Sequence, residues 1–173
     1  MTELTIKATA TRTRNRLNGA MSPVEDRGHL ELRLWLRMIN CSMKMESILS
    51  QRLRKEFKIS MARFDVMSRL ERFPDGLTMS ELSRRLIVSN GAITGLVDKL
   101  ADAGLVTRRE DPKDRRSMIV RLTRKGRENF LRMARRHEEW VVSILGELSV
   151  EAQSELLQNL TLLQRNLDLH GRA

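Results

Sequence analysis

Residues 78–104 read TMSELSRRLIVSNGAITGLVDKLADAG, and this stretch decides the fold class. It opens with a capping-box pattern, in which Thr78 and Glu81 would each bond a backbone N–H at the start of a short helix. Further along, Ser89 can cap a second helix, and Gly104 supplies the stop signal at its end. The stretch therefore predicts two helices joined by a tight turn, which is the arrangement of a helix-turn-helix.

The second of these helices has one apolar stripe, and this stripe determines which residues remain outside. Its members recur at i, i+3, i+4 and i+7 and are Ile93, Leu96, Val97 and Leu100. The opposite face consists of Asn90, Gly91, Thr94, Gly95 and Asp98, with Lys99 at its edge. An exposed glycine inside a helix costs roughly 0.8–1 kcal/mol relative to alanine. Either the two glycines let the helix backbone approach base edges closely, or they relax packing between neighbouring helices.

The stretch that follows predicts a basic β-hairpin. Residues 111–123, DPKDRRSMIVRLT, turn at Asp111-Pro112 and then alternate apolar with polar residues. The predicted strands are Leu105–Arg109 and Ser117–Leu122. Between them the tip carries the cations Lys113, Arg115 and Arg116.

A helix-turn-helix followed by such a hairpin is a winged helix-turn-helix, whose second helix lies in the DNA major groove. The hairpin tip would then reach the minor groove, where negative potential attracts an arginine. Asp114 could hold the side chain of Arg116 in that pose, although a merely solvated tip is the alternative. Arg84 and Arg85 would lie near phosphates and position the module. The predicted DNA contacts are Arg84, Arg85, Ser89, Asn90, Gly91, Thr94, Gly95, Lys99, Lys113, Asp114, Arg115 and Arg116.

Long helices are predicted on both sides of this module. The first runs from His29 to Phe57 with an apolar seam, and at about 1.5 Å per residue its length of about 40 Å suggests a partner helix. The seam is Leu34, Met38, Cys41, Met45 and Ile48. Ser60 can cap a second helix carrying Phe64 and Met67. Thr123 begins a long helix whose predicted buried face is Phe130, Met133, Ala134, His137, Trp140, Val141, Ile144, Leu145 and Leu148. Ser149 begins the last helix, with leucines at heptad spacing at 156, 160, 163 and 167.

Composition narrows the class of partner. Lys and Arg number 32 against 22 Asp and Glu, a net charge of +10, which favours nucleic acid or an anionic surface. No apolar run approaches the roughly 18–20 residues that span a bilayer, so no membrane partner is expected. Residues 1–28 are expected to form a disordered basic arm. The single cysteine, Cys41, excludes an intramolecular disulfide and fits a cytoplasmic location.

Other functions are less well supported by the residues. The three histidines are scattered and no nucleophile, phosphate-loop or metal-ligand pattern occurs, so neither an enzyme, a metal site nor a cofactor is expected. Two alternatives stay open. One is a nonspecific architectural or RNA-binding winged-helix protein, and the other is a redox-sensing regulator acting through Cys41.

The chain resembles the MarR family of dimeric bacterial transcription regulators. The matching segments are GLTMSELSRRL (76–86), NGAITGLVDKLADAGLVTRR (90–109) and DPKDRRSMIVRLTRKG (111–126), the last with the family's D-x-R wing pattern. The resemblance implies a mainly α fold in which a winged helix-turn-helix (58–123) is flanked by dimerisation helices (29–57 and 124–170). It also implies a homodimer that binds an inverted-repeat operator in double-stranded DNA, usually as a repressor.

Residues 32–57 and 62–91 look similar to a branch of this family that controls hydroxycinnamate catabolism. Members of that branch are released from DNA by p-coumaroyl-CoA or feruloyl-CoA, which implies a small aromatic or aromatic acyl-CoA effector here. The candidate effector residues are Arg33, Trp35, Arg37, Met38, Asn40, Cys41, Lys44, Phe64 and Met67. For each apolar member of this set, a place in the ordinary core is the alternative.

Overall fold

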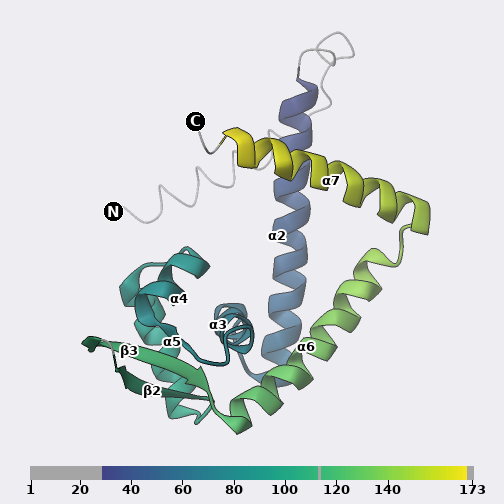
Figure 1. Ribbon diagram of the computed structural model, residues 1–173. Helices are drawn as coiled ribbons and strands as arrows, with labels where there is room; N and C mark the ends of the chain where they lie inside the picture. The colour runs from purple at the N-terminus through teal and green to yellow at the C-terminus, as the bar shows by residue number, and fades with distance from the viewer. Residues whose placement is uncertain (1–28, 113, 171–173) are drawn as a thin grey trace, which may run out of the picture. The chain divides into compact units, whose positions relative to one another are not determined.

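The structure is a computed structural model that describes residues 29–112 and 114–170, with the side chains of Arg115 and Arg116 outside that description. The fold is mainly α-helical with one small sheet, as predicted (Figure 1). Its elements are α2 (Leu30–Phe57), α3 (Met61–Glu71), β1 (Leu77–Thr78), α4 (Met79–Leu86), α5 (Asn90–Asp102), β2 (Val106–Asp111), β3 (Asp114–Leu122), α6 (Arg124–Leu145) and α7 (Val150–His170). No helix in the described ranges is long and apolar enough to cross a membrane.

Hydroxyl caps start the helices where the sequence predicts them. The hydroxyls of Ser60, Thr78, Ser89 and Thr123 accept hydrogen bonds from backbone N–H groups in the first turns of α3, α4, α5 and α6. The capping box of α4 is complete, because the Thr78 N–H also donates to Glu81 Oε2 at 2.8 Å. This backbone donor lowers the pKa of the Glu81 carboxyl below its usual value.

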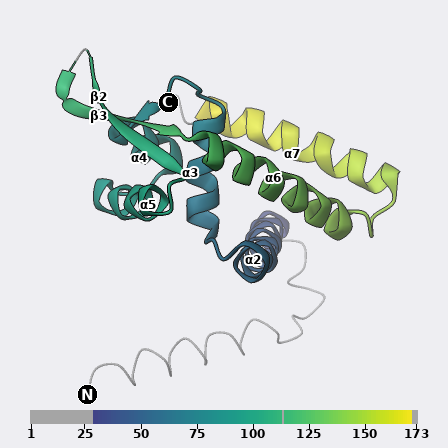
Figure 2. The same ribbon diagram turned by 90° about the horizontal axis from the view of Figure 1, so that it is seen from below.

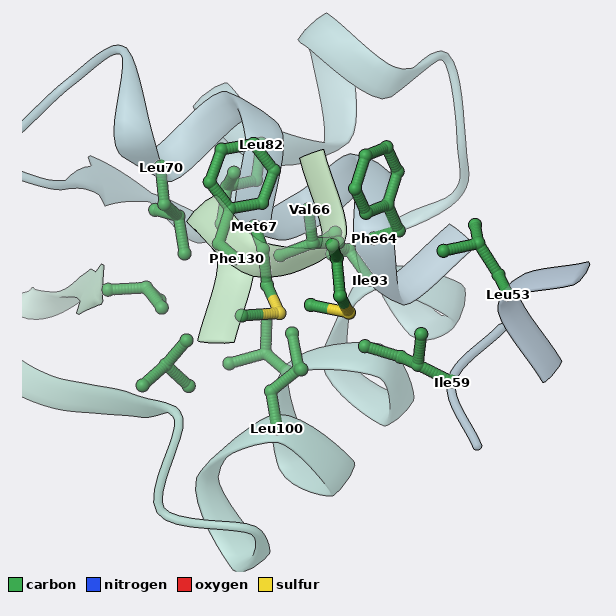
Figure 3. Close-up of a cluster of buried hydrophobic side chains, with 14 of the residues drawn as sticks. Leu53, Ile59, Phe64, Val66, Met67, Leu70, Leu82, Ile93, Leu100 and Phe130 are labelled. Atoms are coloured by element: carbon green, nitrogen blue, oxygen red, sulfur yellow. The ribbon is translucent and has the colours of Figure 1, made fainter. Parts of the chain in front are cut away.

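The core joins side chains of five helices and the sheet. Figure 3 shows Leu53 of α2, Met67 of α3, Leu82 of α4, Ile93 of α5 and Phe130 of α6 directed toward one another. In α5 the buried members of the predicted stripe are Ile93, Val97 and Leu100, each fully buried, whereas Leu96 is only partly buried. Burial of one medium-sized apolar side chain contributes about 1.5–3 kcal/mol. The core therefore holds α5 in one rotational setting.

The sheet differs from the predicted hairpin in two ways. It has the order β1-β3-β2, all antiparallel, and β1 was not predicted. The hairpin strands also reach farther toward the tip than Leu105–Arg109 and Ser117–Leu122, because Glu110 pairs with Met118 and, after a bulge, Asp111 lies opposite Asp114. Thus most of the predicted tip is strand.

The seams predicted on the long helices are not buried within one chain. On α2, Leu34, Met38, Cys41 and Ile48 are exposed and Met45 is half-buried, while Leu49 and Leu53 on the neighbouring face enter the core. On α7 no residue is buried, and Leu148 before it is also exposed. The chain divides into compact units after Met45, so the second half of α2 belongs to the winged-helix unit.

The start of α6 is tied to the junction between α5 and β2. Thr123 Oγ1 donates to the Gly104 carbonyl at 2.8 Å, and the Thr123 N–H donates to the Leu105 carbonyl at 3.0 Å. Lys125 Nζ donates to the Ala103 carbonyl at 2.9 Å. A Cβ atom on Gly126 would stand 1.9 Å from the Leu105 carbonyl oxygen, so this position excludes any side chain.

The turn between α4 and α5 contains a strained residue. Ile87 has φ 55° and ψ 45°, a left-handed conformation that β-branched residues rarely adopt. Its side chain is 92% exposed, so packing does not offset the strain. The turn is held instead by Ser83, whose hydroxyl donates to the Val88 carbonyl at 2.5 Å and whose carbonyl accepts the Val88 N–H at 3.1 Å.

Ile87→Gly is expected to stabilise the protein by about 1 kcal/mol. The left-handed conformation costs about 1–2 kcal/mol for a residue with a Cβ, and removing this strain outweighs the larger conformational entropy that glycine loses on folding. Thermal unfolding would measure the change. Ile87→Val keeps the β-branch and should leave the melting temperature nearly unchanged. A lower melting temperature for the glycine variant would contradict the assignment of strain.

Candidate nucleic-acid interface

The outward face of α5 consists of small and polar residues. Asn90, Gly91, Thr94, Gly95 and Lys99 are exposed, as expected once the opposite stripe is buried. The helix lies against β2, so this face and the hairpin belong to adjoining elements (Figure 2). Ser89, at the N-cap, is exposed as well, and its oxygen accepts the Ala92 N–H at 3.3 Å.

The two glycines of α5 face open space. A Cβ atom built on Gly91 or Gly95 would meet nothing within 4 Å apart from the helix's own neighbouring backbone. Glycine is therefore not required here for packing between helices, which was the alternative explanation. What the missing side chains provide is a bare helix backbone that another molecule can approach closely.

The polar groups beside these glycines are only partly engaged. Thr94 Oγ1 donates to the Asn90 carbonyl at 2.9 Å, a bond within the helix that leaves the hydroxyl oxygen able to accept. The Asn90 side chain is exposed at the first position of α5. Together they place an amide and a hydroxyl acceptor at the amino-terminal end of the helix.

Of the two arginines of α4, one has a defined place. Both Arg84 and Arg85 are exposed in the last turn of the helix. The guanidinium carbon of Arg85 lies 4.3 Å from the centroid of the Phe73 ring, within the range of a cation–π interaction. Its charge is thus held next to the end of α3, whereas no such contact with another described residue fixes Arg84.

The wing tip is described only in part. Lys113 lies outside the described residues, and for Arg115 and Arg116 the structure gives only the backbone, at the start of β3. Asp114 is exposed and takes part in a polar interaction. The predicted pairing of Asp114 with Arg116 therefore stays a prediction.

An ion pair that sequence reasoning missed links α5 to the hairpin. Arg108 Nη2 on β2 donates to Asp98 Oδ1 on α5, and both side chains are partly buried, with 31% and 48% of their areas exposed. From the sequence alone, Arg108 could equally be a phosphate contact or a solvated surface residue. The available signal was Asp98 itself, an acid on the side of α5 that also carries Asn90, Thr94 and the two glycines.

The candidate effector residues fall into two groups, one in each compact unit of the chain. Those on the first half of α2 are all exposed, and Trp35 has 54% of its area exposed. Asn40 Nδ2 donates to the Leu36 carbonyl at 2.9 Å. By contrast, Phe64 and Met67 on α3 are buried in the core of the winged-helix unit.

An aromatic stack surrounds Phe64. Its ring lies 5.0 Å from that of His137 and 5.5 Å from that of Phe130, centroid to centroid. Burial lowers the pKa of His137, with the nearby Asp65 opposing that shift. The sequence prediction that His137 lies on an apolar stripe agrees with this packing.

Comparison with known proteins finds similar transcriptional regulators. A family model described as "MarR family" matches residues 59–118. The uncharacterised HTH-type transcriptional regulator YdgJ of Bacillus subtilis is 28% identical over 110 residues, which are 64% of this chain and 66%, just under two thirds, of YdgJ.

Solved structures match over most of their length. A MarR family transcriptional regulator from Silicibacter pomeroyi has a TM-score of 0.70 and 30% identity, covering 82% of this chain and 98% of that protein. FabT of Streptococcus pneumoniae, solved in complex with DNA, has a TM-score of 0.67 and 25% identity, covering 80% and 97%.

Gly95→Ala is expected to raise the stability of the free protein by about 0.8–1 kcal/mol, because alanine has the higher helix propensity and its methyl group meets open space. The same variant should bind duplex DNA less tightly, since the methyl group holds the backbone away from base edges. Denaturant unfolding and a binding titration would measure the two effects.

Gly126→Ala is the matched control for this test, because its methyl group would collide with the Leu105 carbonyl and should destabilise the protein. A Gly95→Ala protein that bound duplex DNA as tightly as the natural chain would remove the argument for close backbone approach.

Proposed function

The chain belongs to the MarR family of winged helix-turn-helix transcriptional regulators, and on this premise we propose that it is a dimeric, sequence-specific repressor. Its partner is double-stranded DNA carrying an inverted-repeat operator. The observation that carries the proposal is the outward face of α5, where Gly91 and Gly95 border open space beside a basic hairpin.

In this proposal α5 reads the major groove. Asn90 and Thr94 offer polar atoms to base edges, and the bare backbone at the glycines allows close contact. Ser89 and Lys99 lie at the margins of this face, and Arg84 and Arg85 contact phosphates, which positions the helix. In the wing, Lys113, Arg115 and Arg116 meet the flanking minor groove, and Asp114 orients Arg116.

Dimerisation through the long helices is the second part of the proposal. The leucines of α7 and the seam of α2 leave large apolar side chains exposed, among them Leu34 at 55%, Leu160 at 43% and Leu167 at 60%. Exposed apolar surface of this extent is typical of a protein–protein interface. Two copies joined in this way would present two α5 helices to two half-sites about one helical turn apart.

The third part of the proposal is release from DNA by an effector. The resemblance to hydroxycinnamate regulators points to a small aromatic acid or its CoA thioester. Arg33, Arg37 and Lys44 on α2 supply cations for a carboxylate or phosphate. Methionine and aromatic side chains such as Met38 and Trp35 suit a flat apolar ring.

Arg116→Ala is expected to weaken operator binding by about 1–3 kcal/mol and to relax sequence preference beside each half-site. Fluorescence titration at physiological salt would compare the operator with unrelated duplex DNA. The natural protein should prefer its operator by about 10³ or more and bind it as two chains. Equal affinity for every duplex, or binding by a single chain, would refute the proposed function.

Binding of p-coumaroyl-CoA or feruloyl-CoA is expected to raise the melting temperature and to displace the operator, because an effector that favours the free protein competes with DNA. Arg37→Gln should lose this response while retaining DNA binding. Arg54→Gln makes the same charge change on an exposed α2 residue outside the predicted effector set and should respond normally. Displacement by coenzyme A alone would argue against recognition of the aromatic group.

A further inference from the structure

The Asp98–Arg108 pair stands at the boundary between the two elements that would contact DNA. Asp98 comes from the outer side of α5, and Arg108 comes from β2, the first strand of the wing. Toward the amino-terminal end of this side of α5, Asn90, Gly91, Thr94 and Gly95 carry no charge, and the other acid, Asp102, lies one turn beyond Asp98 at the end of the helix. An acid here calls for an explanation, since a carboxylate facing a polyanion is repelled by it.

The pair's surroundings strengthen its electrostatic effect. Both side chains are partly buried, so water screens their attraction less than on an open surface. Arg108 Nε is buried and has no hydrogen-bond partner among the described residues. The contact with Asp98 is thus the hydrogen bond that holds the guanidinium in place.

The backbone gives this contact a mechanical consequence. Arg108 lies opposite Val120 in the β2–β3 ladder, and Val120 is fully buried in the core. A bond from Arg108 to α5 therefore attaches the middle of the hairpin to the recognition helix. The hairpin ladder continues from this point out to Asp111 and Asp114 at the tip.

We propose that Arg108 is a positioning residue, which cancels the charge of Asp98 toward DNA and docks the wing against α5. This inference rests on the proposed DNA-binding function and deepens it. In it, one ion pair fixes the spacing between the helix that reads the bases and the tip of the wing. Arg108 in this role acts through Asp98 and not by its own contact with a phosphate.

A double-mutant cycle on DNA binding tests the proposal, using Asp98→Asn, Arg108→Gln and both changes together. Arg108→Gln leaves an uncompensated carboxylate toward DNA and should weaken operator binding about tenfold. In the Arg108→Gln background, adding Asp98→Asn should raise operator affinity. This gain should exceed by at least threefold the change in affinity that Asp98→Asn causes in the natural protein. Asp98→Asn alone should lower the preference for operator over unrelated duplex.

The rival role, a direct phosphate contact, gives different results. The effects of the two substitutions would then multiply independently, and Arg108→Gln would reduce the salt slope of binding by about 0.9, the contribution of one phosphate. That outcome would overturn the proposal. Arg109→Gln is the matched control, because Arg109 is the exposed neighbour on the same strand and carries the same charge. Its effect should be independent of Asp98.

A readout without DNA separates this inference from the proposed function. In the free protein, Arg108→Gln and Asp98→Asn should each speed amide hydrogen exchange in β2 and β3 several-fold, and the double variant should exchange no faster. Arg109→Gln should leave exchange unchanged. If the natural protein failed to prefer any operator, the proposed function would be refuted, but the exchange rates would still test whether Arg108 docks the wing against α5. Unchanged exchange in both single variants would overturn the docking role of Arg108.

Discussion

The burial of one side of α5 is the constraint on which the rest of the arrangement depends. Ile93, Val97 and Leu100 have no exposed area, so the helix cannot rotate about its axis without opening the core. With that rotation excluded, Gly91 and Gly95 must point outward. The same burial brings Asp98 to the side from which Arg108 approaches.

Some of the positive charge of this chain serves the fold. Arg127 Nε pairs with Glu71 Oε1 at 3.0 Å, which ties α6 to α3. Arg136 Nε lies 2.8 Å from Glu56 Oε1, and its guanidinium also contacts Glu139. The net charge of +10 therefore indicates a class of partner, while the contacts show which cations remain available to it.

Local signals predicted the helices well, because a cap and an apolar stripe both act within a few residues. Ser60, Thr78 and Ser89 each begin a helix as expected. Features made by distant segments were missed. The two-residue strand β1 exists only because β3 lies beside it, and the Asp98–Arg108 contact depends on how β2 packs against α5. Neither has a periodic pattern of its own.

The effector and dimerisation predictions concern contacts between two copies of the chain, and the structure contains one copy. The apolar seam on α2 predicts a partner helix, and in the single chain Leu34, Met38, Cys41 and Ile48 are exposed while Met45 is half-buried. Phe64 and Met67, in contrast, already have neighbours on every side in the core. Periodicity indicates that a residue prefers burial, and the tertiary structure decides which element covers it.

The close contact between Gly126 and Leu105 limits how α6 can move relative to α5 and β2. With three hydrogen bonds around it and no room for even a methyl group, the first turn of α6 and the α5–β2 junction can move only as one rigid piece. A tilt of α6 would swing the wing and the recognition helix through the same arc. This junction is rigid, so any bending between these elements has to occur at other positions along the chain.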